Sequence, residues 1–175
     1  MNRIDSSPKA IFGEYMSILE QFSLRDKVSI MTGGARGLGK AMAQSLAQAG
    51  SDIVIVDLDL AAAQQTADLL AAEGTRTLAL RIDITDPADV DKMTDQILGK
   101  FGHIDVLFNN AGIAQWVNAE DMSLEDWRRM MSVNLDSVFI VSKAVGKVMI
   151  KQGKGSIVNT SSMSGVIVNT PQCQA

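Results

Sequence analysis

The chain alternates short apolar runs with segments of helical periodicity, and this order of elements constrains the fold more than any other feature of its 175 residues. The apolar runs have the length and composition of strands that are buried on both faces. Between them, apolar residues recur every three or four positions, as in helices that pack on a sheet. In chain order, the runs are VSIMT, DIVIVD, RTLALRID, IDVLFNNAG and GSIVNTSS.

Strands of this kind form parallel sheets, and parallel neighbours need crossover connections, which the helical segments provide. Because such crossovers are right-handed, we predict an α/β fold, namely a Rossmann-like doubly wound parallel sheet with helices on both faces. About five strands are present. We expect the sheet to be incomplete on its C-terminal side, which would leave the fifth strand as an edge.

Helix boundaries are marked by capping residues. A helix rich in Ala, Gln and Leu is expected over 60–72. Asp86 supplies an N-cap and Pro87 an N1 proline for a helix over 87–100. Ser123 caps one long helical segment that precedes the fifth strand.

We predict two parts along the chain. Residues 1–23 form an N-terminal extension, and residues 24–175 form a partial dinucleotide-binding domain. Apolar residues of the extension recur at helical spacing, which predicts a helix docked on the domain rather than a membrane anchor. These residues are Phe12, Tyr15, Ile18, Leu19 and Phe22.

Charge and composition exclude several classes of protein. The chain has 16 basic and 20 acidic residues, and its net charge of -4 argues against a nucleic-acid partner. The single cysteine is compatible with a reducing compartment. The start lacks the layout of a signal peptide and no run is long enough to cross a bilayer. We therefore expect a soluble, cytoplasmic protein without a membrane partner, and no metal site, because ligand clusters are absent.

The loop TGGARGLG, from Thr32 to Gly39, joins the first strand to its helix. Backbone N–H groups and a helix N-terminus converge on an anion at such a loop. Gly33 is expected to make the tight turn, Gly37 to leave room for a pyrophosphate, and Gly39 to let the helix pack close to the sheet. The alternative is a loop that merely turns.

Two charged residues make opposite predictions about the nucleotide. Asp57 ends the second strand, where a carboxylate can hydrogen-bond the ribose hydroxyls of the adenosine half and repel a 2′-phosphate. This favours NAD over NADP. Arg36 lies in the glycine loop and could attract a 2′-phosphate. We give Asp57 more weight, because the arginine can instead rest on the adenine or pair with Asp57 itself.

From Leu24 to its end, the chain resembles the classical short-chain dehydrogenase/reductases. TGGARGLG is similar to their Thr-Gly-x-x-x-Gly-x-Gly loop, and NNAG at 109–112 is similar to a second signature. The RIDITD stretch resembles the segment that holds the adenine ring, although Asp83 has the alternative role of capping a turn. The resemblance implies a cofactor site made by Thr32, Gly33, Arg36, Gly37, Leu38, Gly39, Asp57, Asp83, Ile84, Asn110, Ala111 and Gly112.

The resemblance also implies two catalytic residues. Asn134 is similar to the asparagine that helps to hold a water of the proton relay, and asparagine is unfavourable inside a helix without such a reason. Ser162, three residues before Gly165, is similar to the catalytic serine, whereas Ser161 is expected to point to the other face. A structural hydroxyl is the alternative. His103, the only histidine, is interpreted as a solvated turn residue.

The family's general base is a tyrosine followed four residues later by a lysine. The only tyrosine, Tyr15, precedes the first strand and has no such lysine. The stretch SMSGVIVNTPQCQA resembles the approach to that motif in sugar and polyol dehydrogenases. We therefore interpret the chain as an N-terminal fragment of an enzyme that ends before the motif.

The implied function is NAD-dependent oxidation of a secondary alcohol, such as a sugar or polyol, to a ketone, or the reverse reaction. The fragment alone is expected to lack full activity, and the full-length form is expected to be a homodimer or homotetramer. Two alternatives stay open, namely an inactive dinucleotide-binding or regulatory module and an NADP-preferring carbonyl reductase.

Overall fold

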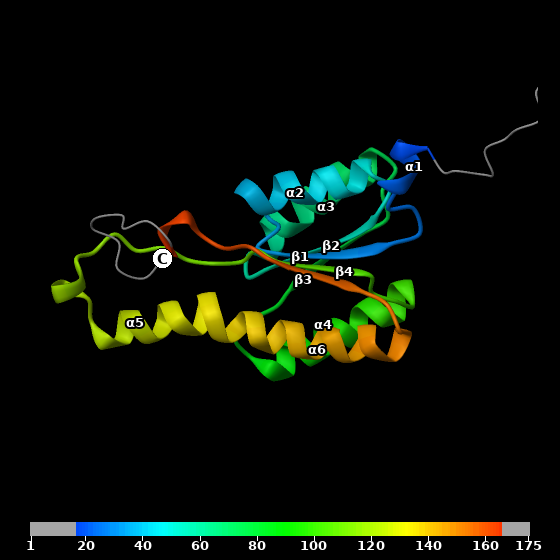
Figure 1. The fold of residues 1–175 in the computed structure, drawn as a ribbon. Helices are drawn as coiled ribbons and strands as arrows, with labels where there is room; N and C mark the ends of the chain where they lie inside the picture. Colours follow the sequence, from blue (N-terminus) through cyan, green and yellow to red (C-terminus); the bar gives the residue numbers. More distant parts are fainter. Residues whose placement is uncertain (1–16, 166–175) are drawn as a thin grey trace, which may run out of the picture.

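A computed structural model describes residues 17–165, which form a five-stranded parallel sheet between two layers of helices (Figure 1). The strand order is β3-β2-β1-β4-β5. The α/β doubly wound prediction is therefore confirmed. The strands are β1 (Val28–Thr32), β2 (Asp52–Asp57), β3 (Thr77–Arg81), β4 (Val106–Asn109) and β5 (Ser156–Asn159).

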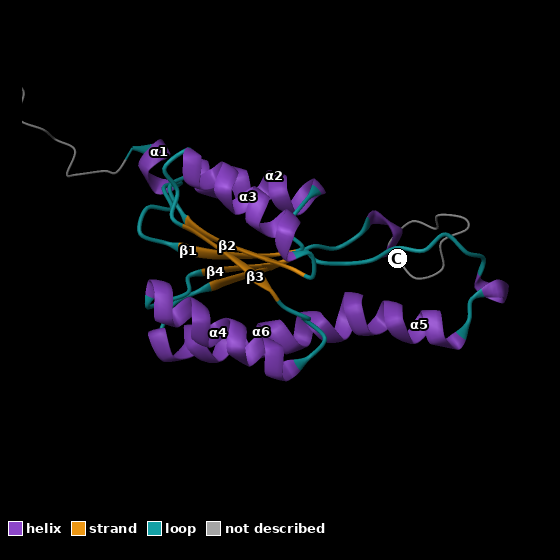
Figure 2. Cartoon of the chain, turned by 180° about the vertical axis from the view of Figure 1, so that it is seen from behind, coloured by secondary structure: helices purple, strands orange, loops and turns teal. Residues whose placement is uncertain are grey.

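The helices lie on both faces of the sheet. Helices α2 and α3 cover one face, and α4 and α6 cover the other, with α5 extending beyond the sheet (Figures 1 and 2). Short 3-10 turns lie at Ala119–Asp121 and Met163–Gly165. The helix bounds are α1 (Ile18–Gln21), α2 (Gly37–Gln48), α3 (Leu60–Ala72), α4 (Pro87–Phe101), α5 (Leu124–Met131) and α6 (Ser137–Gln152).

Successive residues of β2 supply the cores on opposite faces, because side chains alternate across a strand. Ile53 and Ile55 pack with small residues of α2 and α3, such as Ala43 and Ala63. Val54 and Val56 pack into the second cluster, with larger residues of α4 and α6. All the β2 residues between the two ends of the strand are fully buried, as a doubly covered strand requires.

The predicted N-terminal cap of α4 is present. Asp86 accepts the Ala88 N–H and Pro87 opens α4, as expected. The long segment after Ser123 is not one α-helix, however, since a π-helical turn at Ser132–Asp136 divides it into α5 and α6. A π turn holds one residue more than an α turn and is often found at functional positions.

Only part of the predicted N-terminal helix falls within the described residues. Phe12 and Tyr15 lie outside them. The described part is the single turn α1, in which Ile18 is 64% exposed, Leu19 80% and the following Phe22 71%. Over these residues the apolar face is therefore not buried against the domain.

Strand β5 is an edge of the sheet, as predicted for the fifth strand. Within residues 17–165 it pairs with β4 alone, and all four of its residues are exposed. Ile157 and Val158 thus present apolar surface at this edge. None of the helices between residues 17 and 165 combines the length and hydropathy that a bilayer span requires.

His103 lies in the turn between α4 and β4, as predicted, and is partly exposed, but it also has polar partners. Its Nε2 atom lies 3.1 Å from Asp105 Oδ2 and 3.2 Å from the Asp26 carbonyl oxygen. Asp105 is nearly buried and also contacts Lys27 and Lys154. These residues lie at the amino end of the sheet, where β1, β4 and β5 begin, and the charge of the buried carboxylate explains why they gather there.

Candidate functional site

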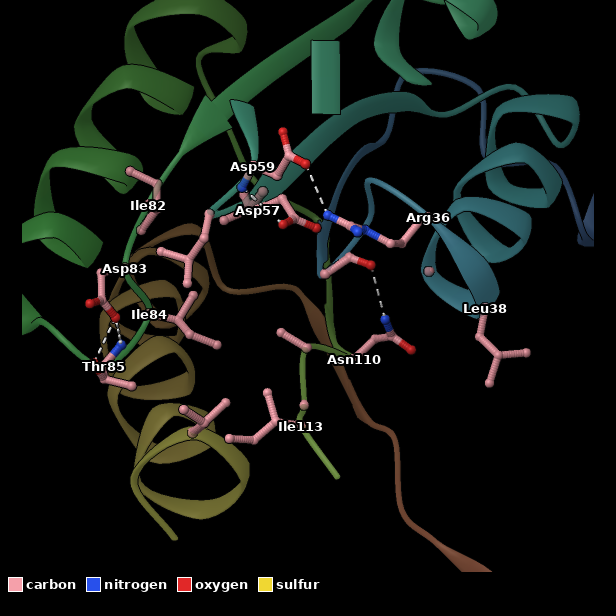
Figure 3. Close-up of a pocket in the computed structure, with 17 residues that line it drawn as sticks. Arg36, Leu38, Asp57, Asp59, Ile82, Asp83, Ile84, Thr85, Asn110 and Ile113 are labelled. Atoms are coloured by element: carbon pink, nitrogen blue, oxygen red, sulfur yellow. Dashed lines mark hydrogen bonds and ion pairs between the residues drawn. The ribbon is translucent and has the colours of Figure 1, made fainter. Parts of the chain in front are cut away.

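A cavity of about 590 Å³ opens at the carboxyl edge of the sheet (Figure 3). The segments that follow β1, β2, β3 and β4 all contribute to its wall. The carboxyl ends of parallel strands meet at one edge, and the strand order reverses between β1 and β4, which creates a crevice there. The topology therefore brings segments that are distant in the sequence into one site.

The three glycines of the first loop are needed for three different reasons. Gly33 has φ +63° and approaches the segment after β4 so closely that an added Cβ would lie 2.8 Å from the Cα of Ala111. Gly37 has φ +56°, and its missing Cβ would point into open space. At Gly39 a Cβ would collide with the Gly33 carbonyl oxygen and lie 2.7 Å from Asn110 Nδ2. The loop and the start of α2 can be this close only with glycine.

The N-terminus of α2 faces the cavity without a side-chain cap. Its N-cap residue, Arg36, is extended, and among residues 17–165 no side chain accepts the first N–H groups of the helix. Those N–H groups and the helix dipole favour an anion. Gly37 leaves the approach to them open. This end of the cavity is thus suited to a phosphate or a similar group.

Asp57 lines the cavity beside the glycine loop, at the end of β2 (Figure 3). The Ala35 N–H donates to its Oδ2 atom at 3.2 Å, and the Asp59 N–H donates to Oδ1 at 3.1 Å. These two bonds fix the carboxylate and join the glycine loop to the segment after β2. Each oxygen keeps a further lone pair for a ligand hydroxyl.

Arg36 does not pair with Asp57, the partner considered from the sequence. Its Nη2 atom lies 3.0 Å from Asp59 Oδ2, and both residues line the cavity (Figure 3). Asp59 also caps α3 by accepting the Ala62 N–H at 3.1 Å. The arginine is therefore held by a residue that the sequence analysis did not select.

Asp83 and Ile84 line the cavity beyond the end of β3. Asp83 Oδ1 accepts the backbone N–H of Thr85 at 2.9 Å and its hydroxyl at 2.6 Å. The turn-capping role that was the alternative for Asp83 is thus present, in a residue that also borders the cavity. Asp83 can cap the turn and also contact a ligand in the cavity, because both bonds to Thr85 use the same carboxylate oxygen.

Thr32 ties the glycine loop to the NNAG segment. Its Oγ1 atom accepts the N–H groups of Asn110 at 3.0 Å and Ala111 at 3.1 Å. Asn110 Nδ2 in turn donates to the Thr32 carbonyl oxygen at 3.1 Å. Thr32 is 1% exposed, so it supports the wall from behind.

Asn134 lies in the π turn, and its side chain forms two hydrogen bonds with the backbone of Ile113. Its Oδ1 accepts the Ile113 N–H and its Nδ2 donates to the Ile113 carbonyl oxygen, both at 2.9 Å. Ile113 and Val133, the neighbour of Asn134, line the cavity. Asn134 therefore joins the π turn to the loop after β4, which accounts for asparagine at an unfavourable helical position.

Ser162 follows β5 and is exposed, and its Oγ accepts the Ser164 N–H at 3.1 Å. The cavity brings together ten of the fourteen predicted site residues. Thr32, Gly37, Asn134 and Ser162 are the four that do not line it. Within residues 17–165 no group of three or more His, Cys, Asp or Glu is arranged to hold a metal ion.

Seven lining residues were missed from the sequence: Val56, Leu58, Asp59, Ile82, Thr85, Ile113 and Val133. Most of them immediately adjoin predicted site residues at strand ends. Their positions at the ends of predicted strands could have identified them, since parallel strands place all their carboxyl ends at one edge of the sheet. Val133 had no such signal, because the folding of the π turn beside Ile113 decides its place.

Known proteins match most of the chain. A family model described as short chain dehydrogenase matches residues 27–173. A sorbose reductase from Candida albicans is 36% identical over 91% of this chain and 57% of its own length. The chain thus spans less than two thirds of that relative.

Solved structures are similar as well. The crystal structure of a short-chain type dehydrogenase/reductase from Mycobacterium marinum has a TM-score of 0.87 and 39% identity, and the match covers 90% of this chain and 64% of the other. The structure of an NAD+-bound xylitol dehydrogenase has a TM-score of 0.82 and 33% identity, over 85% of this chain and 57% of the other.

Proposed function

The chain belongs to the short-chain dehydrogenase family, and from this premise we propose that its cavity binds a nicotinamide dinucleotide, with NAD preferred over NADP. In the proposed reaction a secondary alcohol of sugar or polyol type is oxidised to a ketone, or the ketone is reduced. The observation that carries the proposal is the cavity itself, which has a helix N-terminus without a side-chain cap and, beside it, the carboxylate of Asp57.

The residues present fit such a cofactor. The N–H groups at the start of α2 would hold the pyrophosphate, since Gly37 leaves their approach open. Asp57 would accept hydrogen bonds from the adenosine ribose, and Asp83 and Ile84 would border the adenine. The carboxylate of Asp57 would also repel a 2′-phosphate.

The nicotinamide supplies hydride chemistry when it is bound. The protein's own residues have supporting roles in our proposal. Ser162 would donate a hydrogen bond to the reacting oxygen of the substrate. Asn134 would help to position a water of the proton relay. Its own side-chain amide is held in place by its two hydrogen bonds to the Ile113 backbone.

The substrate class is inferred from similarity. The related proteins include a sorbose reductase and a xylitol dehydrogenase, whose names refer to a sugar and a polyol. The SMSGVIVNTPQ stretch supports the same class. A polyol is therefore the substrate that we propose to test first.

Calorimetry with NADH and NADPH tests the cofactor assignment. We expect the chain to bind NADH more tightly than NADPH. In the Asp57→Ala variant the affinity for NADH should fall about tenfold to a hundredfold, because hydrogen bonds to a charged group contribute about 1.5–3 kcal/mol. The preference over NADPH should shrink in the same variant.

Asp95→Ala is the matched control, since this exposed aspartate of α4 lies outside the cavity. It should leave both affinities unchanged. Unaltered NADH binding by Asp57→Ala would contradict the role of Asp57, and an absence of any nucleotide binding by the unmodified chain would contradict the proposed function.

A second candidate, nucleotide binding without efficient turnover, is favoured for this chain by its lack of a suitable base. Tyr15 is its only tyrosine, and Leu19 rather than a lysine lies four residues later. We expect the chain to reduce NAD with xylitol about 10²–10⁴-fold more slowly than an enzyme that has a positioned general base. NADH binding by the same sample shows that the site is formed, and turnover at an ordinary rate would overturn this prediction.

A further inference from the structure

We propose that Asp59 is a positioning residue for cofactor choice, which holds Arg36 so that the arginine is not free to pair with a 2′-phosphate. The inference rests on the proposed function and adds a second determinant to it. Asp57 would act on the ribose directly, whereas Asp59 would act through Arg36.

The geometry around Asp59 uses each of its polar groups. Its backbone N–H donates to Asp57 Oδ1 at 3.1 Å, which holds the Asp57 carboxylate against the backbone of Asp59. Its Oδ1 caps α3 through the Ala62 N–H, and its Oδ2 lies 3.0 Å from Arg36 Nη2. The start of α3 and the end of β2 therefore set the position at which Arg36 is held (Figure 3).

The side chain of Arg36 has few contacts apart from Asp59. Its side chain is 71% exposed, and within the described part of the chain Asp59 is its one ion-pair partner. It belongs to the glycine loop and lines the same cavity as Asp57. Among the described residues that line the cavity, Arg36 is the one lysine or arginine, so its ion-pair partner decides whether a cation is available there for a phosphate.

The expected effect is modest, because exposed ion pairs are weak. Asp59 is itself 46% exposed on its side chain. A 2′-phosphate would have to replace the carboxylate as the partner of Arg36, and an exposed pair of this type changes such an equilibrium by about fivefold at most. Asp57 would remain the stronger determinant.

A double-mutant cycle tests the proposal with Asp59→Asn, Arg36→Gln and the double variant. Asparagine is also a good N-cap, so α3 should keep its cap, and thermal unfolding checks that it does. The dissociation constants of NADH and NADPH are measured by calorimetry, without turnover. Asp95→Asn is the control for the lost negative charge.

We expect Asp59→Asn to strengthen NADPH binding about threefold to fivefold and to change NADH binding less than twofold. The gain should disappear in the Arg36→Gln background, and Asp95→Asn should show none. An equal gain without the arginine would mean that Asp59 acts directly as a charge, and no gain at all would show that it does not matter; either result overturns the proposal. If the unmodified chain binds NADH in those cases, the proposed function itself survives.

Discussion

Replacement of Gly39 by alanine is expected to weaken NADH binding strongly and to destabilise the chain. A Cβ at this position would collide with the Gly33 carbonyl oxygen and crowd Asn110 Nδ2. Both contacts belong to segments fixed by strands β1 and β4, so neither can move freely. Overpacking of this kind costs about 1–3 kcal/mol of unfolding free energy.

The effect on binding should be larger than the effect on stability. A shift of the loop or of α2 would misalign the N–H groups proposed to hold the pyrophosphate. Each hydrogen bond to a charged group contributes about 1.5–3 kcal/mol, so the loss of two weakens binding by about a hundredfold or more. Calorimetry with NADH and urea unfolding measure the two effects separately.

Gly99→Ala is the matched control. Gly99 lies in α4, where an added Cβ would meet no other atom within 4 Å. Alanine should therefore stabilise the chain by about 0.5–1 kcal/mol and leave NADH binding unchanged. If Gly39→Ala behaved like this control, the close approach of α2 to the glycine loop would not be what the nucleotide site requires.

Replacement of Asp105 by alanine is expected to give the largest loss of stability, about 3 kcal/mol of unfolding free energy. The side chain is only 6% exposed, and it accepts the Val28 N–H at 3.1 Å. Lys27 Nζ and Lys154 Nζ lie 3.4 and 3.3 Å from its Oδ1. Without the carboxylate, a buried N–H and the cations around it lose their shared partner.

This contribution should depend on pH. Burial alone would raise the pKa of Asp105. The Val28 N–H, Lys154, Lys27 and His103 lower it by more than burial raises it, so the pKa of the carboxyl lies below its ordinary value. The folded-state pKa is thus below the unfolded one. The stabilisation is fully present above the unfolded pKa, about 4, and is lost as the pH falls through the folded value.

Urea unfolding of the unmodified chain and of Asp105→Ala between pH 7 and pH 3 measures this dependence. The difference in unfolding free energy should be constant near neutral pH and should shrink below about pH 4. Asp95→Ala, at an exposed position, should differ little from the unmodified chain throughout. A difference that grew as the pH fell would show that Asp105 does not stabilise the fold as a carboxylate.

Local patterns predicted the elements well because the causes are local. The helix expected over 60–72 is α3, and the helix expected over 87–100 is α4 with one more residue. Apolar runs predicted strands, and capping residues such as Asp86 predicted where helices begin. The long helical segment expected after Ser123 is present, but the spacing did not predict the π turn that contains Asn134 between α5 and α6.

The sequence by itself determined the order of strands and helices, the glycine loop and the acidic residue at the end of β2, because periodicity, capping and steric demands act between near neighbours. The tertiary structure alone decided that Arg36 pairs with Asp59, that Asn134 holds Ile113 and that Lys27 and Lys154 both contact Asp105. These contacts join residues that are far apart in the chain, and any nearby opposite charge or free backbone group could have been the partner. Only the packed sheet selects among such partners, since it fixes which strand ends lie side by side.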